Sequence, residues 1–135
     1  MILVIHTADL EQVFIGLLAQ RRWLAKRSFK ARYRQAEQLL PAIDKLLLAK
    51  KIKPSQLQAI AVVSGPASFT ALRIGVVTAN TLAWSLRLPV FSLKLTEFAT
   101  ADELLAVVSK KVTQKKNEKV VKPFYGALPN ITLKK

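Results

Sequence analysis

The chain has 135 residues, the size of one domain with a single apolar core and too short for two catalytic lobes. It contains no cysteine, which excludes disulfides and thiolate metal sites, and its one histidine excludes a histidine-based zinc site. No apolar run reaches the ~18 residues that a membrane span needs, and no cleavable leader is evident. These observations predict a soluble, cytoplasmic protein without a membrane partner.

The net charge of +14 is concentrated in two segments. Residues 20–34 hold seven Lys or Arg and no acid, residues 109–135 hold eight Lys and one acid, and the rest is neutral. Such clusters favour a polyanion such as RNA, because they release its counterions on binding. The alternative is a solvated surface that keeps the chain soluble. The candidate RNA contacts are Arg22, Lys26, Lys30, Arg32, Lys115 and Lys116.

The N-terminal part predicts three antiparallel strands. Residues 2–8 and 12–19 are short apolar runs separated by a polar turn, which is typical of a hairpin. Residues 23–33 alternate in polarity, so a third strand with one wet, basic face is expected. Its core face is expected to hold Trp23, Ala25, Phe29, Ala31 and Tyr33, and its wet face Lys26, Ser28, Lys30 and Arg32.

Helices and strands alternate in the remainder of the predicted fold. The spacing of apolar residues predicts an amphipathic helix over 34–51, kinked at Pro41, which lacks the amide for an interior bond. The expected elements that follow are a buried strand at 59–64, a helix at 69–86, a strand from 89 and a helix at 96–109. This order predicts an α/β domain whose later strands join the first sheet in parallel through right-handed crossovers.

The Lys-rich residues 110–122 are expected to form a linker or flexible arm. This expectation divides the chain into a domain at 1–108 and a linker and tail at 109–135.

Residues 62–75, VVSGPASFTALRIG, join the buried strand to the next helix. Hydroxyl groups and the amides of a helix N-terminus attract phosphate, but the same hydroxyls cap any helix. A P-loop is excluded because the turn lacks the lysine and the second glycine of that motif. Both interpretations, a cap and a phosphate site, stay open, and capping by Ser64, Ser68 and Thr70 is preferred.

This stretch resembles the hallmark of the TsaB family, also called YeaZ, which reads roughly Gly-Pro-Gly-Ser-Phe-Thr-Gly-Leu-Arg-Ile-Gly. The resemblance extends to ILVIHTA at the start of the chain and to AEQLLPAIDKLL, covers residues 1 to about 100, and resumes at Pro123-Phe124-Tyr125. It implies one ribonuclease H-like lobe of the actin-like ATPase (ASKHA) architecture, with a mixed five-stranded sheet and most of the second lobe missing. The matched positions are Gly65, Pro66, Ser68, Phe69, Thr70, Leu72, Arg73, Ile74 and Gly75.

The resemblance implies a non-catalytic partner of TsaD in the threonylcarbamoyl modification of the tRNA adenosine next to the anticodon. TsaE in a larger complex and contact of tRNA with the basic segments are further expectations. No catalytic residue, metal or cofactor is expected, because nucleotide in this superfamily lies between two lobes. His6 stands where TsaB commonly has Asp and is a poor magnesium ligand, so a structural role is expected for it.

The predicted second helix carries two stripes at helical spacing. A broad stripe of small and apolar residues suits packing on the sheet, whereas a narrower strip is expected to bind TsaD, or a second copy of the chain in a homodimer. Trp and Arg are favoured interface anchors. The alternatives are that the strip packs under a loop, that the chain is a free-standing basic RNA-binding module, or that it is a residual ATPase. The narrower strip holds Arg73, Ile74, Val77, Thr81 and Trp84.

Overall fold

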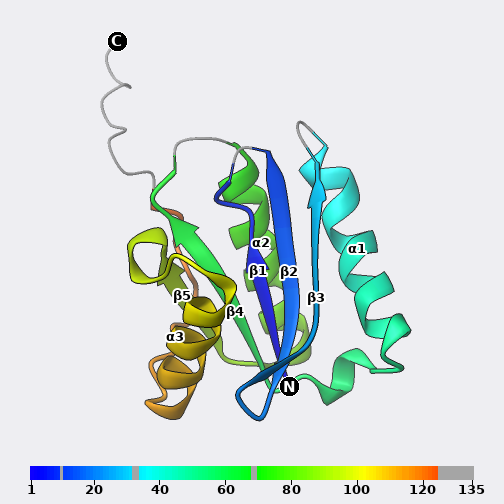
Figure 1. Ribbon diagram of the computed structural model, residues 1–135, viewed down its shortest axis with the longest axis vertical. Helices are drawn as coiled ribbons and strands as arrows, with labels where there is room; N and C mark the ends of the chain where they lie inside the picture. Colours follow the sequence, from blue (N-terminus) through cyan, green and yellow to red (C-terminus); the bar gives the residue numbers. More distant parts are fainter. Residues whose placement is uncertain (10, 32–33, 68–69, 125–135) are drawn as a thin grey trace.

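The computed structural model describes residues 1–9, 11–31, 34–67 and 70–124. Its five strands form one mixed sheet in the order β3-β2-β1-β4-β5 (Figure 1). β1 pairs antiparallel with β2 and parallel with β4, and β5 extends the parallel half. The predicted mixed five-stranded sheet is therefore confirmed. The elements are β1 (Ile2–His6), β2 (Gln12–Ala19), β3 (Arg22–Lys30), α1 (Gln35–Ala49), η1 (Pro54–Gln56), β4 (Ala59–Gly65), α2 (Thr70–Leu86), β5 (Val90–Lys94), η2 (Leu95–Glu97) and α3 (Ala101–Thr113).

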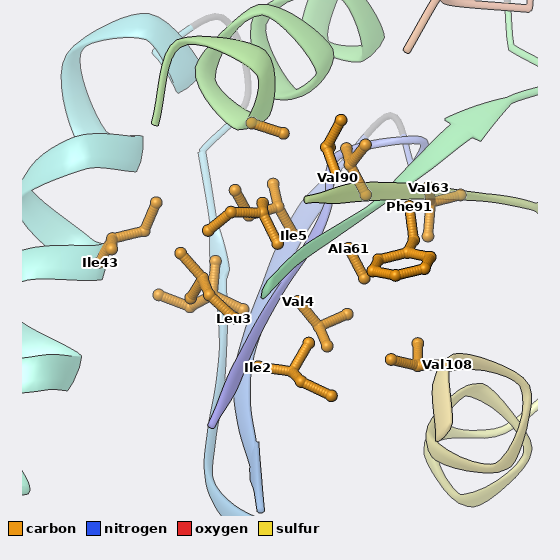
Figure 2. Packing of buried hydrophobic residues seen from close by; sticks show 14 of the residues in the cluster. Ile2, Leu3, Val4, Ile5, Ile43, Ala61, Val63, Val90, Phe91 and Val108 are labelled. Atoms are coloured by element: carbon orange, nitrogen blue, oxygen red, sulfur yellow. The ribbon is translucent and has the colours of Figure 1, made fainter. Parts of the chain in front are cut away.

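Helices cover both faces of the sheet. α1 and α2 lie side by side on one face, and α3 lies on the other (Figure 1). The central strands β1 and β4 are apolar on both faces for this reason, and every residue of β4 is buried. Leu3 points toward Ile43 of α1, whereas Val4 lies on the side of Phe91 and Val108 of α3 (Figure 2). None of the helices within the described residues is long and apolar enough to cross a membrane.

A bulge in β3 changes the predicted faces of this strand. The pairing of β2 with β3 shifts register and skips Leu24, so Trp23 faces the opposite side of the sheet from Phe29. Trp23 Nε1 donates to the carbonyl of Ala101 in α3 at 3.1 Å, whereas Phe29 lines a groove beside α1. The expectation that these two aromatics share one face was wrong, because a strict alternation of residues takes no account of a bulge. Residues 32–33 of the expected strand lie outside the described residues.

Helix α3 begins and ends later than expected. Thr100 is its N-cap: the Thr100 hydroxyl accepts from the amide of Glu103 at 3.1 Å, and the Glu103 carboxylate accepts from the amide of Thr100. The helix then continues to Thr113, so the expected boundary between 108 and 109 falls inside it. The lysines at 110 and 111 suit this position, because cations are stabilised near a helix C-terminus. α1 includes Pro41 as a helical residue.

Residues 117–124, here called the C-terminal strap, pack against the sheet and α2. The amide of Glu118 donates to the carbonyl of Val90 at 2.8 Å. The Asn80 side chain donates to the Val121 carbonyl at 2.8 Å and accepts from the Val121 amide at 2.9 Å. Val121 is only 1% exposed. The expectation of a linker or flexible arm at 110–122 was therefore wrong. It rested on the lysine-rich composition, which gives no indication of the buried Val121 or of the backbone hydrogen bonds.

The packing of the strap predicts unequal effects of substitution at two neighbouring valines. Val121→Ala removes a buried side chain and should lower the free energy of unfolding by about 2 kcal/mol. Val120→Ala, at a side chain that is 58% exposed, should change it by less than about 0.5 kcal/mol. Urea denaturation of both variants tests this; equal effects would mean that the strap is not packed in solution.

Helix α2 lies unusually close to the end of β1. Thr7 is fully buried, and its hydroxyl donates to the carbonyl of Ala71 at 2.6 Å. A Cβ atom placed on Gly75 would lie 2.1 Å from Thr7 Oγ1, which no real side chain tolerates. Glycine at 75 is therefore required by the packing distance between helix and strand.

Gly75→Ala should accordingly destabilise the fold by about 1–3 kcal/mol, the usual cost of overpacking. Alanine is otherwise the better helix former, so the sign of the change identifies the clash. The same substitution in a Thr7→Ala background should cost less, since Oγ1 is then gone. A double-mutant cycle by thermal or urea denaturation measures the difference; additive effects would contradict a direct contact.

Candidate functional site

The predicted partner strip lies along the outer face of α2. Trp84 is 81% exposed and Val77 is 54% exposed, which is unusual for large apolar side chains. Arg73 and Thr81 are also exposed, whereas Ile74 is half-buried against the core. The structure thus brings four of the five predicted residues to solvent, at intervals of three and four that place them on one helical stripe.

Helix α1 adds exposed leucines that were not predicted as site residues. Leu40 is 53% exposed and Leu48 is 67% exposed. α1 and α2 are neighbours on the same face of the sheet (Figure 1), so exposed apolar side chains occur on both helices of this layer. Sequence periodicity missed them: Leu40 falls at the same helical spacing as the core residues Leu39 and Ile43, yet neither Leu40 nor Leu48 is among the buried residues of α1. Large exposed apolar side chains are a feature that protein-binding surfaces share.

A hollow of about 570 Å³ adjoins this surface at the C-terminal end of α2. Trp84 lines it together with Arg87 and Pro89, and the strap contributes Glu118 and Lys119. The Trp84 ring therefore stands at the edge of a concave region.

The turn between β4 and α2 is occupied by the chain's own strap. The amide of Phe124 donates to the carbonyl of Ser64 at 2.7 Å, and the amide of Ala67 donates to the carbonyl of Phe124 at 3.2 Å. Gly65 has a φ of 128°, and a Cβ atom there would lie 2.0 Å from the same carbonyl. The Ser64 hydroxyl donates to the carbonyl of Leu93 at 3.2 Å. These groups are used within the protein, which favours a structural junction over a phosphate site.

His6 ends β1 in a largely apolar setting. Its Nδ1 accepts from the amide of Ala8 at 3.1 Å, and its ring meets Phe98 edge to face at 5.7 Å. Burial lowers the pKa of His6 below its usual value, and the nearby charge of Asp9 opposes this shift. The neutral imidazole with its proton on Nε2 fits these contacts, and the ring serves as a packing element beside a cavity of about 210 Å³.

His6 makes stability depend on pH in a definite direction. Because the pKa is lower in the folded state, the unfolded chain binds more protons as the pH falls below about 6.5, and stability decreases there. Well above that pH, His6 is neutral in both the folded and the unfolded chain, and this loss of stability is absent. His6→Gln should remove this slope, so the loss of stability between pH 7.5 and pH 5 should be smaller than in the unsubstituted chain. Denaturation of both at the two pH values tests this, and parallel curves would contradict it.

The predicted RNA-contacting cations are exposed wherever the structure describes them. Arg22, Lys26 and Lys30 lie on β3, which is an edge strand, and Lys115 and Lys116 follow α3. Arg32 lies outside the described residues. Arg21 and Lys110, which were not predicted individually, line one cavity. Both belong to the basic segments, so the sequence showed that they are charged but not that they lie at the same cavity.

Comparison with known proteins defines the class first. In the solved structures, the chain superposes on YeaZ from Pseudomonas aeruginosa with a TM-score of 0.64 and 30% identity, over 69% of this chain and 43% of the other. A family model described as TsaD, tRNA N6-adenosine threonylcarbamoyltransferase, matches residues 30–114. The fold is thus a ribonuclease H-like lobe of the actin-like ATPase architecture, as the sequence resemblance implied.

Two curated relatives narrow the assignment. The tRNA threonylcarbamoyladenosine biosynthesis protein TsaB of Bacillus subtilis (strain 168) is 34% identical over 88 residues, which are 65% of this chain and 38% of the relative. TsaB of Buchnera aphidicola subsp. Schizaphis graminum (strain Sg) is 30% identical over 96 residues, 70% of this chain and 46% of the relative. The chain therefore belongs to the TsaD-like family that this model describes, and within it to the TsaB (YeaZ) proteins. It spans less than half the length of these curated relatives.

Proposed function

We propose that this chain is a non-catalytic, cytoplasmic subunit in the biosynthesis of threonylcarbamoyladenosine in tRNA, and that it binds TsaD through the outer face of α2. The observation that carries the proposal is the exposure of Trp84, of which 81% is accessible. The pathway is the one named for the curated TsaB relatives. The contact residues are Arg73, Val77, Thr81 and Trp84, with Ile74 supporting them from below.

The energetics favour Trp84 as the anchor of such an interface. A tryptophan side chain buries about 200 Å² of surface, which is worth about 5 kcal/mol before the costs of association. The helix that presents it is itself fixed to the sheet by the close contact with Thr7, so little order is lost on docking. A rigid helix with an exposed Trp at one end and an exposed Val two turns earlier fits the groove or helical face of a partner.

The non-catalytic role is supported by the two places where a nucleotide would be handled. At the β4–α2 turn, the carbonyl of Phe124 in the strap accepts the hydrogen bond of the Ala67 amide. At the end of β1, a neutral, half-buried His6 stands where TsaB commonly has Asp. Neither group is arranged to hold a magnesium-bound phosphate.

The alternatives to a simple TsaD heterodimer at this surface are a second copy of the chain and a larger assembly that also contains TsaE. A free-standing RNA-binding module is not favoured. Stacking on bases needs exposed aromatic rings, and Trp23 and Phe29 are instead half-buried on opposite faces of the sheet.

Trp84→Ala should weaken binding to TsaD by about 2 kcal/mol or more, which is roughly a 30-fold increase in Kd, because it removes the anchor. The free energy of unfolding of the isolated chain should change by less than about 0.5 kcal/mol, since the side chain is exposed. Leu24→Ala is the matched control, an exposed apolar residue on β3 that should affect neither quantity. Calorimetric titration with TsaD and urea denaturation provide the two readouts.

The result has three informative forms. Loss of affinity with intact stability supports the proposal. Unchanged affinity for TsaD together with a loss of self-association assigns the surface to a homodimer instead. A large loss of stability would show that Trp84 is a core residue in solution and would refute the surface.

A further inference from the structure

The two basic segments of the sequence meet at one cavity. The turn between β2 and β3 and the C-terminal half of α3 enclose a space of about 390 Å³ between them. Both lie at the lower end of the view in Figure 1. Its polar lining comes from Arg21, Ser109, Lys110, Thr113 and Gln114, and no acidic residue lines it among those that the structure describes. Two cations and three neutral hydrogen-bonding groups are a donor set suited to an anion.

Ser109 has an unused hydroxyl beside this cavity. Its Oγ is buried, and within the described residues it has no hydrogen-bond partner. A buried hydroxyl without a hydrogen-bond partner is energetically unfavourable, so the position of the Ser109 hydroxyl needs an explanation. Rotation about χ1 between staggered rotamers redirects a serine hydroxyl by a few ångströms, which is enough to turn it toward the cavity that Ser109 lines. The Ser109 hydroxyl would then gain a hydrogen-bond partner if an oxyanion occupied the cavity.

The backbone at Arg21 is in a conformation that arginine disfavours. Gln20 and Arg21 form the whole two-residue turn, with φ of 53° and 61°. Such a turn prefers Asn-Gly, because both residues are left-handed. Non-glycine residues in this region are enriched at functional sites, where the side chain is needed in spite of the backbone. Of the basic residues with this backbone conformation in the described part of the chain, which are Arg21, Lys51, Arg87 and Lys115, Arg21 is the one that lines the cavity.

From this geometry we infer that the cavity between the β2–β3 turn and α3 binds a phosphate of an RNA backbone. Arg21 supplies two parallel donors, Lys110 supplies charge, and Ser109 and Thr113 supply neutral donors. The negative end of the α3 dipole lies near, but Lys110, Lys115 and Lys116 carry three positive charges at this end of the helix, which outweigh that partial charge. Lys111 is not counted, because its ammonium group pairs with Glu97 at 2.9 Å. An RNA backbone is favoured over free phosphate because the exposed Lys26 and Lys30 of β3 offer further contacts for a long polyanion.

This inference does not rest on the binding of TsaD, because the cavity includes none of the strip residues of α2. The test uses the full chain and a labelled RNA hairpin at 0.1 M salt. Arg21→Gly should lower the affinity about fivefold to tenfold, the contribution of one phosphate contact, and reduce the salt slope by about one. It should also raise the melting temperature, because glycine suits the turn, so unfolding cannot explain the loss.

Arg87→Gly is the matched control. Arg87 has a φ of 57°, at the end of α2, so this change removes the same charge from the same backbone conformation outside the cavity. A second pair is Lys110→Gln with Lys45→Gln, an exposed lysine of α1. Ser109→Ala should lower RNA affinity without lowering stability. Trp84→Ala should bind RNA as the unsubstituted chain does.

Larger losses for the cavity variants than for their controls support a phosphate site. Equal losses would mean that RNA is held by diffuse charge alone and would overturn the inference. If inorganic phosphate occupies the cavity as tightly as the hairpin, or polyglutamate binds as well as RNA, the assignment to an RNA backbone is wrong.

Discussion

The contact between Thr7 and Gly75 fixes the relation between the central strand and the second helix. Gly75 has no space for a side chain, and the Thr7 hydroxyl donates to a helix carbonyl one turn earlier. α2 is therefore held against the end of β1, and its opposite stripe, which carries Val77 and Trp84, must face away from the sheet. The candidate partner surface is a direct consequence of this close packing.

The polar backbone groups of the β4–α2 turn are occupied by the strap. The strap returns to this turn and uses the amide of Ala67 and the carbonyl of Ser64. Lys94 Nζ lies 5.0 Å from the centre of the Phe124 ring, which adds a cation–π contact at the same place. A motif that attracts phosphate elsewhere is here a junction between a strand, a helix and the strap.

Much of the fold could be predicted from local patterns. The buried run at 59–64 and the amphipathic spacing in α1 and α2 gave elements within a few residues of those observed. The bulge at Leu24 could not be predicted, because one extra residue leaves the composition of β3 unchanged while reversing the face of Trp23. The strap was missed because its single buried residue, Val121, stands among lysines and is held by a side chain far away in the sequence, Asn80.

One candidate site could be predicted from a local sequence pattern, and the other could not. The strip on α2 followed from helical periodicity, since the residues that bind the core and those that face solvent alternate within one element. The cavity that joins Arg21 to Lys110 depends on two segments far apart in the sequence, and no local pattern reports their contact. Charge clustering identified the segments, and only the tertiary structure identified the residues.

The exposure of Trp84 in the presence of TsaD tests the central claim most directly. The chain has two tryptophans, and Trp23 is hydrogen-bonded to α3, so fluorotryptophan labelling gives an internal reference. Fluorine NMR in light and heavy water reports the solvent contact of each ring. The account predicts a solvent isotope shift at Trp84 that disappears when TsaD is added, with Trp23 unchanged. A Trp84 resonance that keeps its solvent shift in a saturated complex would contradict the proposed interface.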